Sequence, residues 1–272
     1  MTAINIPKKS VNRIKTYING LDENMEGGIP EGHLSLLCGS AGTMKSSICF
    51  NVLYNEAMTR GKTGIYFSLE QSHISLLAHM VNMGYDFDKI NLVVIKDLGN
   101  LKKEIDSLKL TNRGTIIITD VGAIRKEIRD IKVTTANTGW LNVIKNVARK
   151  IKLEARLDLF VLDSLSALYV LSKFENPRIE LFYIFEFIRD LKVTSFLISE
   201  MPLDNSRYSE YEVEDYLCDG IIYLKLSRFR RDVVREVSIV KMRGTECNND
   251  VFSLEYKKGA FHAMYGGQNP LL

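Results

Sequence analysis

The sequence has no long hydrophobic run. Its longest unbroken apolar stretches, such as residues 167–171, contain five residues, whereas a helix that spans a membrane needs about 20. The basic residues near the N-terminus, among them Lys8 and Lys9, are not followed by an apolar segment of the kind found in secretory signals. We therefore expect a cytoplasmic protein without a membrane span.

Cysteine is scarce, with 4 residues in a chain of 272. The cysteines lie far apart and none forms a C-x-x-C pair, which favours buried free thiols over disulfides or a zinc site; they are Cys38, Cys49, Cys218 and Cys247. The net charge is also low, because 36 Lys and Arg face 33 Asp and Glu and leave +3. A charge this small gives no argument for nucleic-acid binding by itself.

What the sequence does contain, over its first two thirds, is an alternation of short apolar runs and helical patterns, typical of a parallel sheet covered by helices. It predicts strands at 33–38, 64–69, 92–95, 115–119, 158–162 and 193–199, and helices at 46–58, 72–84, 140–153 and 178–191. In the last third, β-rich runs at 220–226, 234–242 and 251–256 have short polar connections, which predicts antiparallel hairpins.

These patterns predict an α/β fold whose mostly parallel central sheet is flanked by helices and carries C-terminal antiparallel β-hairpins. The composition is that of a globular protein, with 46% hydrophobic residues. Because no linker or repeat interrupts the chain, we expect one domain over residues 1–272, with a lead-in to about residue 16 and a tail from about residue 262.

A loop of small residues separates the first of these strands from the first helix. Its sequence is Gly39-Ser40-Ala41-Gly42-Thr43-Met44-Lys45-Ser46-Ser47, which fits the Walker A pattern except at Met44, where the pattern has glycine. In such a loop the backbone N–H groups turn toward phosphate, Lys45 reaches the terminal phosphates, and the Ser46 hydroxyl binds Mg²⁺. We favour nucleotide binding over a chance turn before an ordinary helix, provided that the Met44 side chain points away from the phosphates.

Acidic residues end three neighbouring strands of the predicted sheet. A phosphate-binding loop of this kind requires one carboxylate on the metal side and another to polarise the attacking water. Asp163 and Asp120 both follow apolar runs and are equal candidates for the metal side on periodicity alone. Glu70, which follows the run at 65–69, is the candidate base. Each of them alone would equally fit an acid that faces solvent.

From about Asn12 to Phe261 the chain resembles the KaiC-like branch of the RecA superfamily. The likeness rests on the order of several motifs, which are Ile18-Asn19-Gly20-Leu21-Asp22, Glu26-Gly27-Gly28-Ile29-Pro30-Glu31-Gly32, Phe67-Ser68-Leu69-Glu70, Asp163-Ser164, Arg178-Ile179-Glu180-Leu181-Phe182, Ser199-Glu200 and Val240-Lys241-Met242-Arg243-Gly244-Thr245. The resemblance implies a RecA-like P-loop ATPase. It also implies that Asp163, rather than Asp120, is the Walker B aspartate and that Glu70 is the catalytic glutamate.

In the KaiC-like family ATP lies between the subunits of a ring. The resemblance therefore implies a homo-oligomer, a hexamer-like ring, in which Lys241 and Arg243 reach the γ-phosphate held by a neighbouring subunit. This is an arginine-finger arrangement that ties hydrolysis to assembly. From the sequence alone, two solvated cations on an outer strand are an equal alternative.

The chain also departs from the family pattern. KaiC has two consecutive glutamates where this chain has Glu70-Gln71, and two copies of the domain where this chain has one. We therefore expect slow hydrolysis, do not infer a clock role, and assign no autophosphorylation site. The residues after Thr245 do not follow the sequence pattern of the family. The chain between residues 98 and 140 is longer than a compact core requires.

The segment after the strand at 193–199 bears on DNA binding, because RecA-type recombinases place a basic DNA-binding loop there. Residues 200–216 hold six acids and one base, a net charge that repels phosphate. Tyrosines 208, 211 and 216 are expected to pack on the domain or on a neighbour rather than on bases. Two basic stretches keep DNA binding open as an alternative. One is at a hairpin tip and contains Lys225, Arg228, Arg230, Arg231 and Arg235, and the other is on a helix and contains Lys145, Arg149, Lys150, Lys152 and Arg156.

The sequence thus predicts an ATPase that binds Mg-ATP at residues 39–47 and serves as a signalling or regulatory switch. One alternative is an accessory ATPase of DNA recombination or repair. The other is a nucleotide-binding assembly scaffold with little turnover. The basic hairpin could also form a subunit interface opposite the acidic loop of the next subunit.

Overall fold

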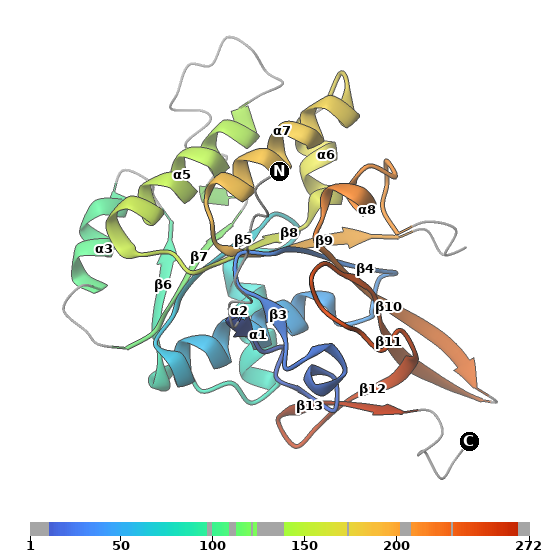
Figure 1. Ribbon diagram of the computed structural model, residues 1–272. Helices are drawn as coiled ribbons and strands as arrows, with labels where there is room; N and C mark the ends of the chain where they lie inside the picture. The colour runs from blue at the N-terminus through green and yellow to red at the C-terminus, as the bar shows by residue number, and fades with distance from the viewer. Residues whose placement is uncertain are drawn as a thin grey trace, which may run out of the picture.

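The computed structural model describes residues 11–96, 100–108, 113–120, 122–123, 139–172, 174–201, 208–229 and 231–265. Within these ranges one large sheet runs through the molecule (Figure 1). Its strands are β2 (Ile18–Asn19), β4 (Leu34–Gly39), β5 (Thr63–Ser68), β6 (Asn91–Ile95), β7 (Thr115–Asp120), β8 (Leu159–Asp163), β9 (Thr194–Glu200), β10 (Gly220–Phe229), β11 (Asp232–Met242), β12 (Val251–Lys257) and β13 (Ala260–Tyr265). A separate short pair joins β1 (Arg13–Ile14) and β3 (Ile29–Pro30).

The order of the strands across the large sheet is β2-β13-β12-β11-β10-β4-β9-β8-β5-β7-β6. From β10 to β6 all neighbours are parallel, and from β10 to β13 all are antiparallel. Strand β10 therefore joins the two parts, since it lies parallel to β4 and antiparallel to β11. This topology confirms the predicted mostly parallel sheet with C-terminal antiparallel hairpins.

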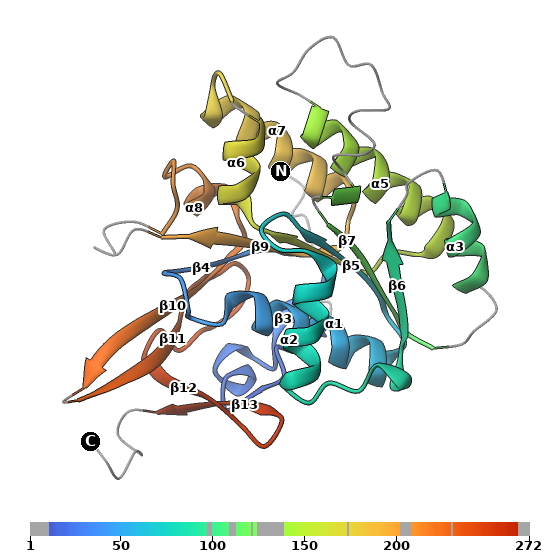
Figure 2. The same cartoon turned by 180° about the vertical axis from the view of Figure 1, so that it is seen from behind.

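Helices cover both faces of the sheet (Figures 1 and 2). One face carries α5 (Gly139–Ala155), α6 (Leu165–Ser172) and α7 (Pro177–Asp190), and the other carries α1 (Lys45–Arg60) and α2 (His73–Asn82). Two shorter helices are α3 (Leu101–Leu108) and α8 (Glu214–Leu217). Because strand side chains alternate between faces, Leu36 and Leu37 of β4 belong to two different hydrophobic cores.

Local sequence explains where the helices around the candidate site begin and end. The Ser72 hydroxyl accepts a hydrogen bond from the backbone N–H of Ser75 and caps α2, inside the helix predicted at 72–84. Gly84 follows α2 with a φ of 92°, and Gly61 ends α1 with a φ of 64°. Both are left-handed conformations that glycine adopts readily, so these stops follow directly from the sequence.

The structure extends the sequence-based prediction at two places. Strand β7, which belongs to the extra chain between 98 and 140, lies inside the sheet between β5 and β6 and is fully buried, so this part of the extra chain belongs to the core. Strand β13 continues to Tyr265, inside the segment expected to form a tail. Its hydrogen bonds to β12 and β2 stabilise residues whose own pattern is too short to predict a strand.

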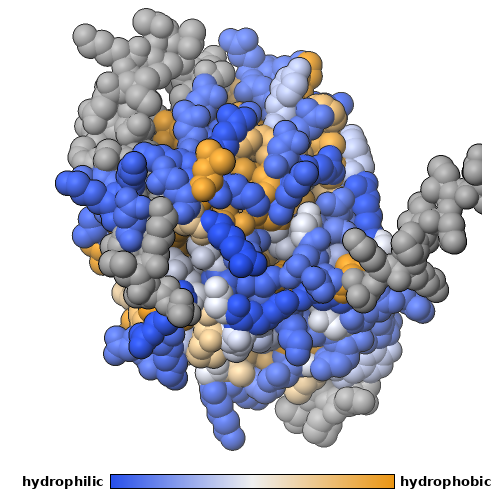
Figure 3. All heavy atoms as spheres, turned by 60° about the vertical axis from the view of Figure 1, so that its left-hand side comes forward, coloured by the Kyte–Doolittle hydropathy of each residue, from blue (hydrophilic) through white to orange (hydrophobic). Residues whose placement is uncertain are grey.

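The side of the molecule that lies to the left in Figure 1 is mostly hydrophilic, with hydrophobic residues gathered in one area (Figure 3). On α5, two cations of the basic stretch lie over the ring of Phe187 in α7, with the Lys145 Nζ at 5.5 Å and the Arg149 guanidinium carbon at 5.1 Å from the ring centroid. Part of this basic stretch thus contacts the protein itself. No described helix is long and apolar enough to cross a membrane.

Candidate nucleotide-binding site

The loop at 39–47 connects the carboxyl end of β4 to the N-terminus of α1, at the centre of the sheet. Gly39 lies so close to β10 that a Cβ atom there would come within 2.2 Å of the Leu224 carbonyl oxygen. Gly42 has a φ of 83°, and the Thr43 hydroxyl donates a hydrogen bond to the Ser40 carbonyl. Glycine is thus required at position 39 by the close approach of β10, and at position 42 by the left-handed backbone conformation.

Met44 occupies the position at which the loop pattern has glycine, and its backbone explains that preference. Its φ is 72° and its ψ is 25°, a left-handed conformation that is costly for a residue with a Cβ atom. The side chain packs against the hydrophobic core on the α1 side of the sheet. It therefore turns away from the loop interior, as the sequence analysis required.

Lys45 lies inside the loop with only 4% of its side chain exposed. Its ammonium donates hydrogen bonds to the carbonyl oxygens of Gly39 and Ser40, both at 2.9 Å, and forms an ion pair with Glu200 Oε1 at 2.7 Å. Glu200 ends β9, and the parallel register of β4 and β9 places it opposite Gly39. The sequence indicates that Glu200 ends a strand, but it does not indicate this contact.

Asp163 ends β8 and is buried beside the loop. Tyr66 donates a hydrogen bond to Oδ2, whereas Oδ1 is buried without a hydrogen-bond partner. Burial raises the pKa of this carboxyl to about 6, although hydrogen bonds from Tyr66 and Ser46 oppose the shift. A buried carboxylate that the Ser46 hydroxyl approaches, and whose Oδ1 accepts no hydrogen bond, suits a divalent cation, so Ser46 and Asp163 fit the predicted Mg²⁺ site.

The raised pKa of Asp163 predicts that the free energy of unfolding depends on pH. The pKa of Asp163 is higher in the folded than in the unfolded chain, so protonation of this carboxyl stabilises the folded state. This contribution to the free energy of unfolding is fully present below about pH 4 and is lost as the pH rises through about 6. Without metal, this contribution should amount to roughly 3 kcal/mol. Denaturant unfolding from pH 4 to pH 7 should show it in the wild type and not in Asp163→Asn, and a constant difference between the two proteins over this range would contradict the assignment.

Glu70 follows β5 and is exposed at the same edge of the sheet. The Ser164 hydroxyl, next to Asp163 in the sequence, donates a hydrogen bond to Glu70 Oε1. The Leu69 N–H donates to the Asp163 carbonyl at 2.6 Å, which holds the two strand ends together. The structure thus brings Glu70, Asp163 and the loop together, the arrangement that a catalytic base for an attacking water requires.

Asp120, the alternative to Asp163, also lies at this edge, but protein groups occupy both of its oxygens. The backbone N–H and the Nδ1 of His73 contact Oδ2, at 2.9 and 2.7 Å, and the N–H groups of Gly122 and Ala123 donate to Oδ1. Burial raises the pKa of Asp120, and these hydrogen bonds, chiefly from His73, outweigh it and lower the pKa. Asp120 thus fixes the start of α2 and the turn after β7.

Lys241 and Arg243 lie at the opposite end of the sheet from the loop of their own chain. Lys241 pairs with Ile221, which pairs with Leu36 near the start of β4, and the Arg243 N–H donates to the Asp219 carbonyl. Since Asp219 is hydrogen-bonded to Leu34, about five strand residues or 16 Å separate Arg243 from the start of the loop. The structure does not bring these two cations to the loop within one chain.

Instead, both cations bind the segment that contains α8. The Lys241 ammonium donates to the carbonyl oxygens of Asp215 and Cys218, at 2.9 and 2.8 Å. The Arg243 guanidinium donates to Asp219 Oδ1 and to the Tyr216 carbonyl, both at 2.9 Å, and 49% of its side chain remains exposed. Both side chains thus bind the same segment, and Arg243 retains surface for a further partner.

The acidic segment, residues 200–216, contacts the rest of the domain at several described residues. Glu214 is fully buried and accepts a hydrogen bond of 2.6 Å from the Tyr169 hydroxyl. The rings of Tyr211 and Tyr208 pack edge-on against Tyr169 and Tyr223. These two tyrosines pack on the domain, as expected, whereas Tyr216 is 61% exposed. Asp204 and Arg207 lie outside the described residues.

Arg235 of the β10–β11 hairpin contacts the loop, which the sequence did not indicate. Its Nε donates to the Gly42 carbonyl at 3.1 Å. The hairpin continues past the pairing of Leu224 with Gly39, so that its distal part extends beyond the loop. The basic hairpin tip, of which Arg230 lies outside the described residues, is thus adjacent to the candidate phosphate site and not a remote surface.

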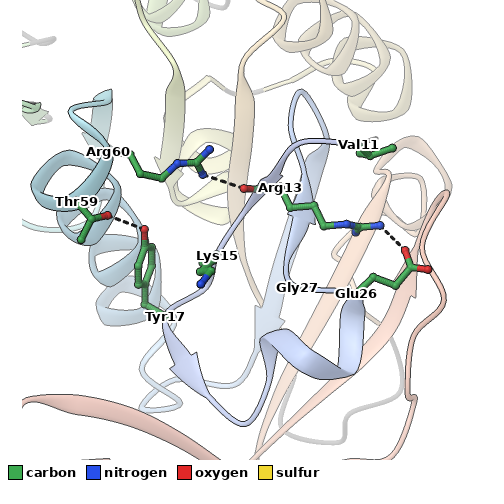
Figure 4. Close-up of a pocket in the computed structure, with 8 residues that line it drawn as sticks. All are labelled: Val11, Arg13, Lys15, Tyr17, Glu26, Gly27, Thr59 and Arg60. Carbon is green, nitrogen blue, oxygen red and sulfur yellow. Dashed lines mark hydrogen bonds and ion pairs between the residues drawn. The ribbon is translucent and has the colours of Figure 1, made fainter. Parts of the chain in front are cut away.

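A separate cavity of about 630 Å³ lies at the other end of α1 (Figure 4), lined by Val11, Arg13, Lys15, Tyr17, Glu26, Gly27, Thr59 and Arg60. No residue of the loop lines it. Arg13 reaches from this cavity to the hydroxyl of Thr245, two residues after Arg243, and so connects the N-terminal segment to the segment that contains Lys241 and Arg243.

The described cysteines are all free, as predicted.

Comparison with known proteins agrees with this geometry. The family model described as "ATPase: KaiC" matches residues 14–261. The chain belongs to the KaiC ATPase family. Nucleotide binding is implied by that membership, and proteins of the KaiC family typically form oligomers. The predicted resemblance and the KaiC-like RecA fold are confirmed.

Several known proteins are similar to this chain over most of its length. A UPF0273 protein of Pyrobaculum aerophilum is 26% identical, over 94% of this chain and 84% of that protein. The crystal structure of a KaiC-like protein from Pyrococcus horikoshii OT3 has a TM-score of 0.69 and 26% identity, over 93% of this chain and 99% of that chain. The circadian clock oscillator protein KaiC 1 of Synechocystis sp. is 25% identical over 88% of this chain, which spans 42% of its length.

Proposed function

We propose that this KaiC-family protein binds and slowly hydrolyses Mg-ATP at the loop 39–47. The observation that carries the proposal is the unpaired, buried Oδ1 of Asp163, which lies beside a complete phosphate-binding loop. Ser46 and Asp163 would hold Mg²⁺, which would neutralise charge on the phosphates. Lys45 would bind the terminal phosphates, and Glu70, positioned by Ser164, would orient the attacking water and accept its proton.

The same proposal extends to a homo-oligomeric ring in which Lys241 and Arg243 complete the ATP site of a neighbouring subunit. Arg243 lies too far from the loop of its own chain to contact a phosphate there, since about 16 Å exceeds the reach of one arginine. The Lys241 ammonium is bound to the carbonyl oxygens of Asp215 and Cys218. Arg243 is nevertheless exposed and charged. A cation supplied by the neighbour would make turnover depend on assembly, which suits a nucleotide-dependent regulatory switch.

DNA binding is the less favoured function. Three described acids of segment 200–216 are already bound, Glu200 to Lys45, Glu214 to Tyr169 and Asp215 to Ser209. The two packed tyrosines of this segment lie against the domain. A DNA-binding surface requires exposed cations, and the described residues of this segment, 200–201 and 208–216, include no lysine or arginine.

The proposed function is tested by equilibrium binding of Mg-ATP and by phosphate release. We expect the wild type to bind Mg-ATP and release phosphate slowly, and Lys45→Ala to lose at least about tenfold in affinity because the loop loses its only ammonium. Lys89→Ala, which removes an exposed lysine of the short helical turn Phe87–Lys89 before β6, is the control and should resemble the wild type. A wild type that bound no nucleotide would contradict the proposal.

A further inference from the structure

Lys45 already has a full set of protein partners. Its ammonium has three N–H groups, and the structure pairs it with two loop carbonyls and with the carboxylate of Glu200. The carbonyls belong to the loop that surrounds a bound phosphate chain, so Lys45 can keep these contacts when nucleotide binds. The contact with Glu200 is different, because a carboxylate and a phosphate compete for the same ammonium hydrogen.

The backbone of Glu200 is fixed, whereas its carboxylate has room to move. Its N–H donates to the Ser166 hydroxyl at 3.1 Å, and the N–H of Met201 donates to the Gly39 carbonyl at 3.2 Å. Strand register holds Glu200 opposite Gly39. The Glu200 side chain is 35% exposed, against 4% for Lys45. A change of partner at Lys45 therefore requires only rotation of the Glu200 side chain toward solvent.

We infer that Glu200 is a displaceable counter-ion of Lys45 and sets the preference of the site between nucleoside triphosphates and diphosphates. The inference rests on the proposed function. A P-loop lysine reaches the β- and γ-phosphates. A triphosphate brings both of these groups to Lys45, so it must displace the Glu200 carboxylate and overcome its repulsion, whereas a diphosphate brings one phosphate and less charge and competes less with the ion pair. Glu200 thus weakens triphosphate binding selectively, and re-forms its pair with Lys45 after the γ-phosphate has left.

The test is Glu200→Gln, which keeps the shape and removes the charge. The affinities to be measured, with Mg²⁺ present, are those for ADP and for the non-hydrolysable imido analogue of ATP. We expect Glu200→Gln to bind the triphosphate about tenfold more tightly than the wild type and to change ADP affinity less than about twofold. Glu210→Gln removes one exposed charge from the same acidic segment and should change neither affinity.

The outcomes separate this inference from the proposed function. Equal tightening for both nucleotides would show that Glu200 repels anions generally and would overturn the selectivity. Unchanged affinities, in a wild type that binds nucleotide, would overturn the inference and leave the proposed function intact. A wild type that bound neither nucleotide would overturn the proposed function and this inference with it.

Discussion

Asp163→Asn should lower phosphate release from Mg-ATP at least about a hundredfold and, at neutral pH without metal, raise the free energy of unfolding. Both effects follow from one feature, a carboxylate held in a buried position where its charge is unfavourable and one oxygen has no partner. The amide keeps the size of the side chain and can still accept the Tyr66 hydrogen bond. It loses the charge that a divalent cation requires. Opposite changes in activity and stability are typical of a functional charge.

The matched control is Asp120→Asn, at the end of β7, which β5 separates from β8 in the same sheet. Its carboxylate accepts hydrogen bonds from His73, Gly122 and Ala123. We expect this substitution to lower the free energy of unfolding by about 1 to 2 kcal/mol and to change turnover only a few-fold. Phosphate release and denaturant unfolding of the two variants, measured side by side, check both expectations. If Asp120→Asn were the inactive variant, the assignment of the metal ligand would be wrong.

Arg243→Ala should lower turnover about 10²- to 10³-fold while Mg-ATP binding by the loop changes little. The reason is geometric: the loop and Arg243 lie at opposite ends of the sheet, so that removal of Arg243 leaves the binding residues of its own chain in place. Phosphate release and equilibrium binding distinguish the two effects, and sedimentation velocity with and without Mg-ATP reports assembly. A variant with wild-type turnover would contradict a catalytic role for Arg243.

The control for Arg243→Ala is Arg235→Ala. Arg235 is also an exposed arginine, and it lies in β11, which Arg243 directly follows, but it contacts the Gly42 carbonyl of its own chain. A cation that supports the loop should affect nucleotide affinity, whereas a cation supplied to a neighbour should affect turnover. We therefore expect a larger change in affinity for Arg235→Ala and a larger change in turnover for Arg243→Ala. Equal changes in affinity and in turnover in the two variants would indicate that both changes result from the loss of a positive charge and not from its position.

The sequence predicts those parts of the site that lie within one segment or directly follow a strand. The loop 39–47 is a contiguous motif, and Glu70 and Asp163 each follow an apolar run, so that topology alone brings them to one edge of the sheet. The fold was predictable for the same reason, since the alternation of strands and helices is a local pattern. Periodicity could not choose between Asp120 and Asp163, because the choice depends on which neighbours occupy the carboxylate oxygens.

Contacts between distant segments were not predictable from the sequence. The ion pair of Lys45 with Glu200 depends on the register of β4 and β9, and the hydrogen bonds of Lys241 with the α8 segment depend on the fold of a loop without a periodic pattern. Strand β13 was missed because its short run of alternating residues forms a strand only beside β12. In each case a tertiary contact decides the structure.

The most direct test of the central claim, that ATP is hydrolysed by residues from two subunits, is phosphate release from a mixture of two inactive variants. Asp163→Asn lacks the metal ligand of its own site, and Arg243→Ala lacks the cation for the neighbouring site. In an equimolar mixture that assembles at random, sites with intact residues from both subunits form at about a quarter of the interfaces. We predict recovery of about a quarter of wild-type turnover. A mixture as inactive as either variant alone, with assembly confirmed by sedimentation, would contradict the account.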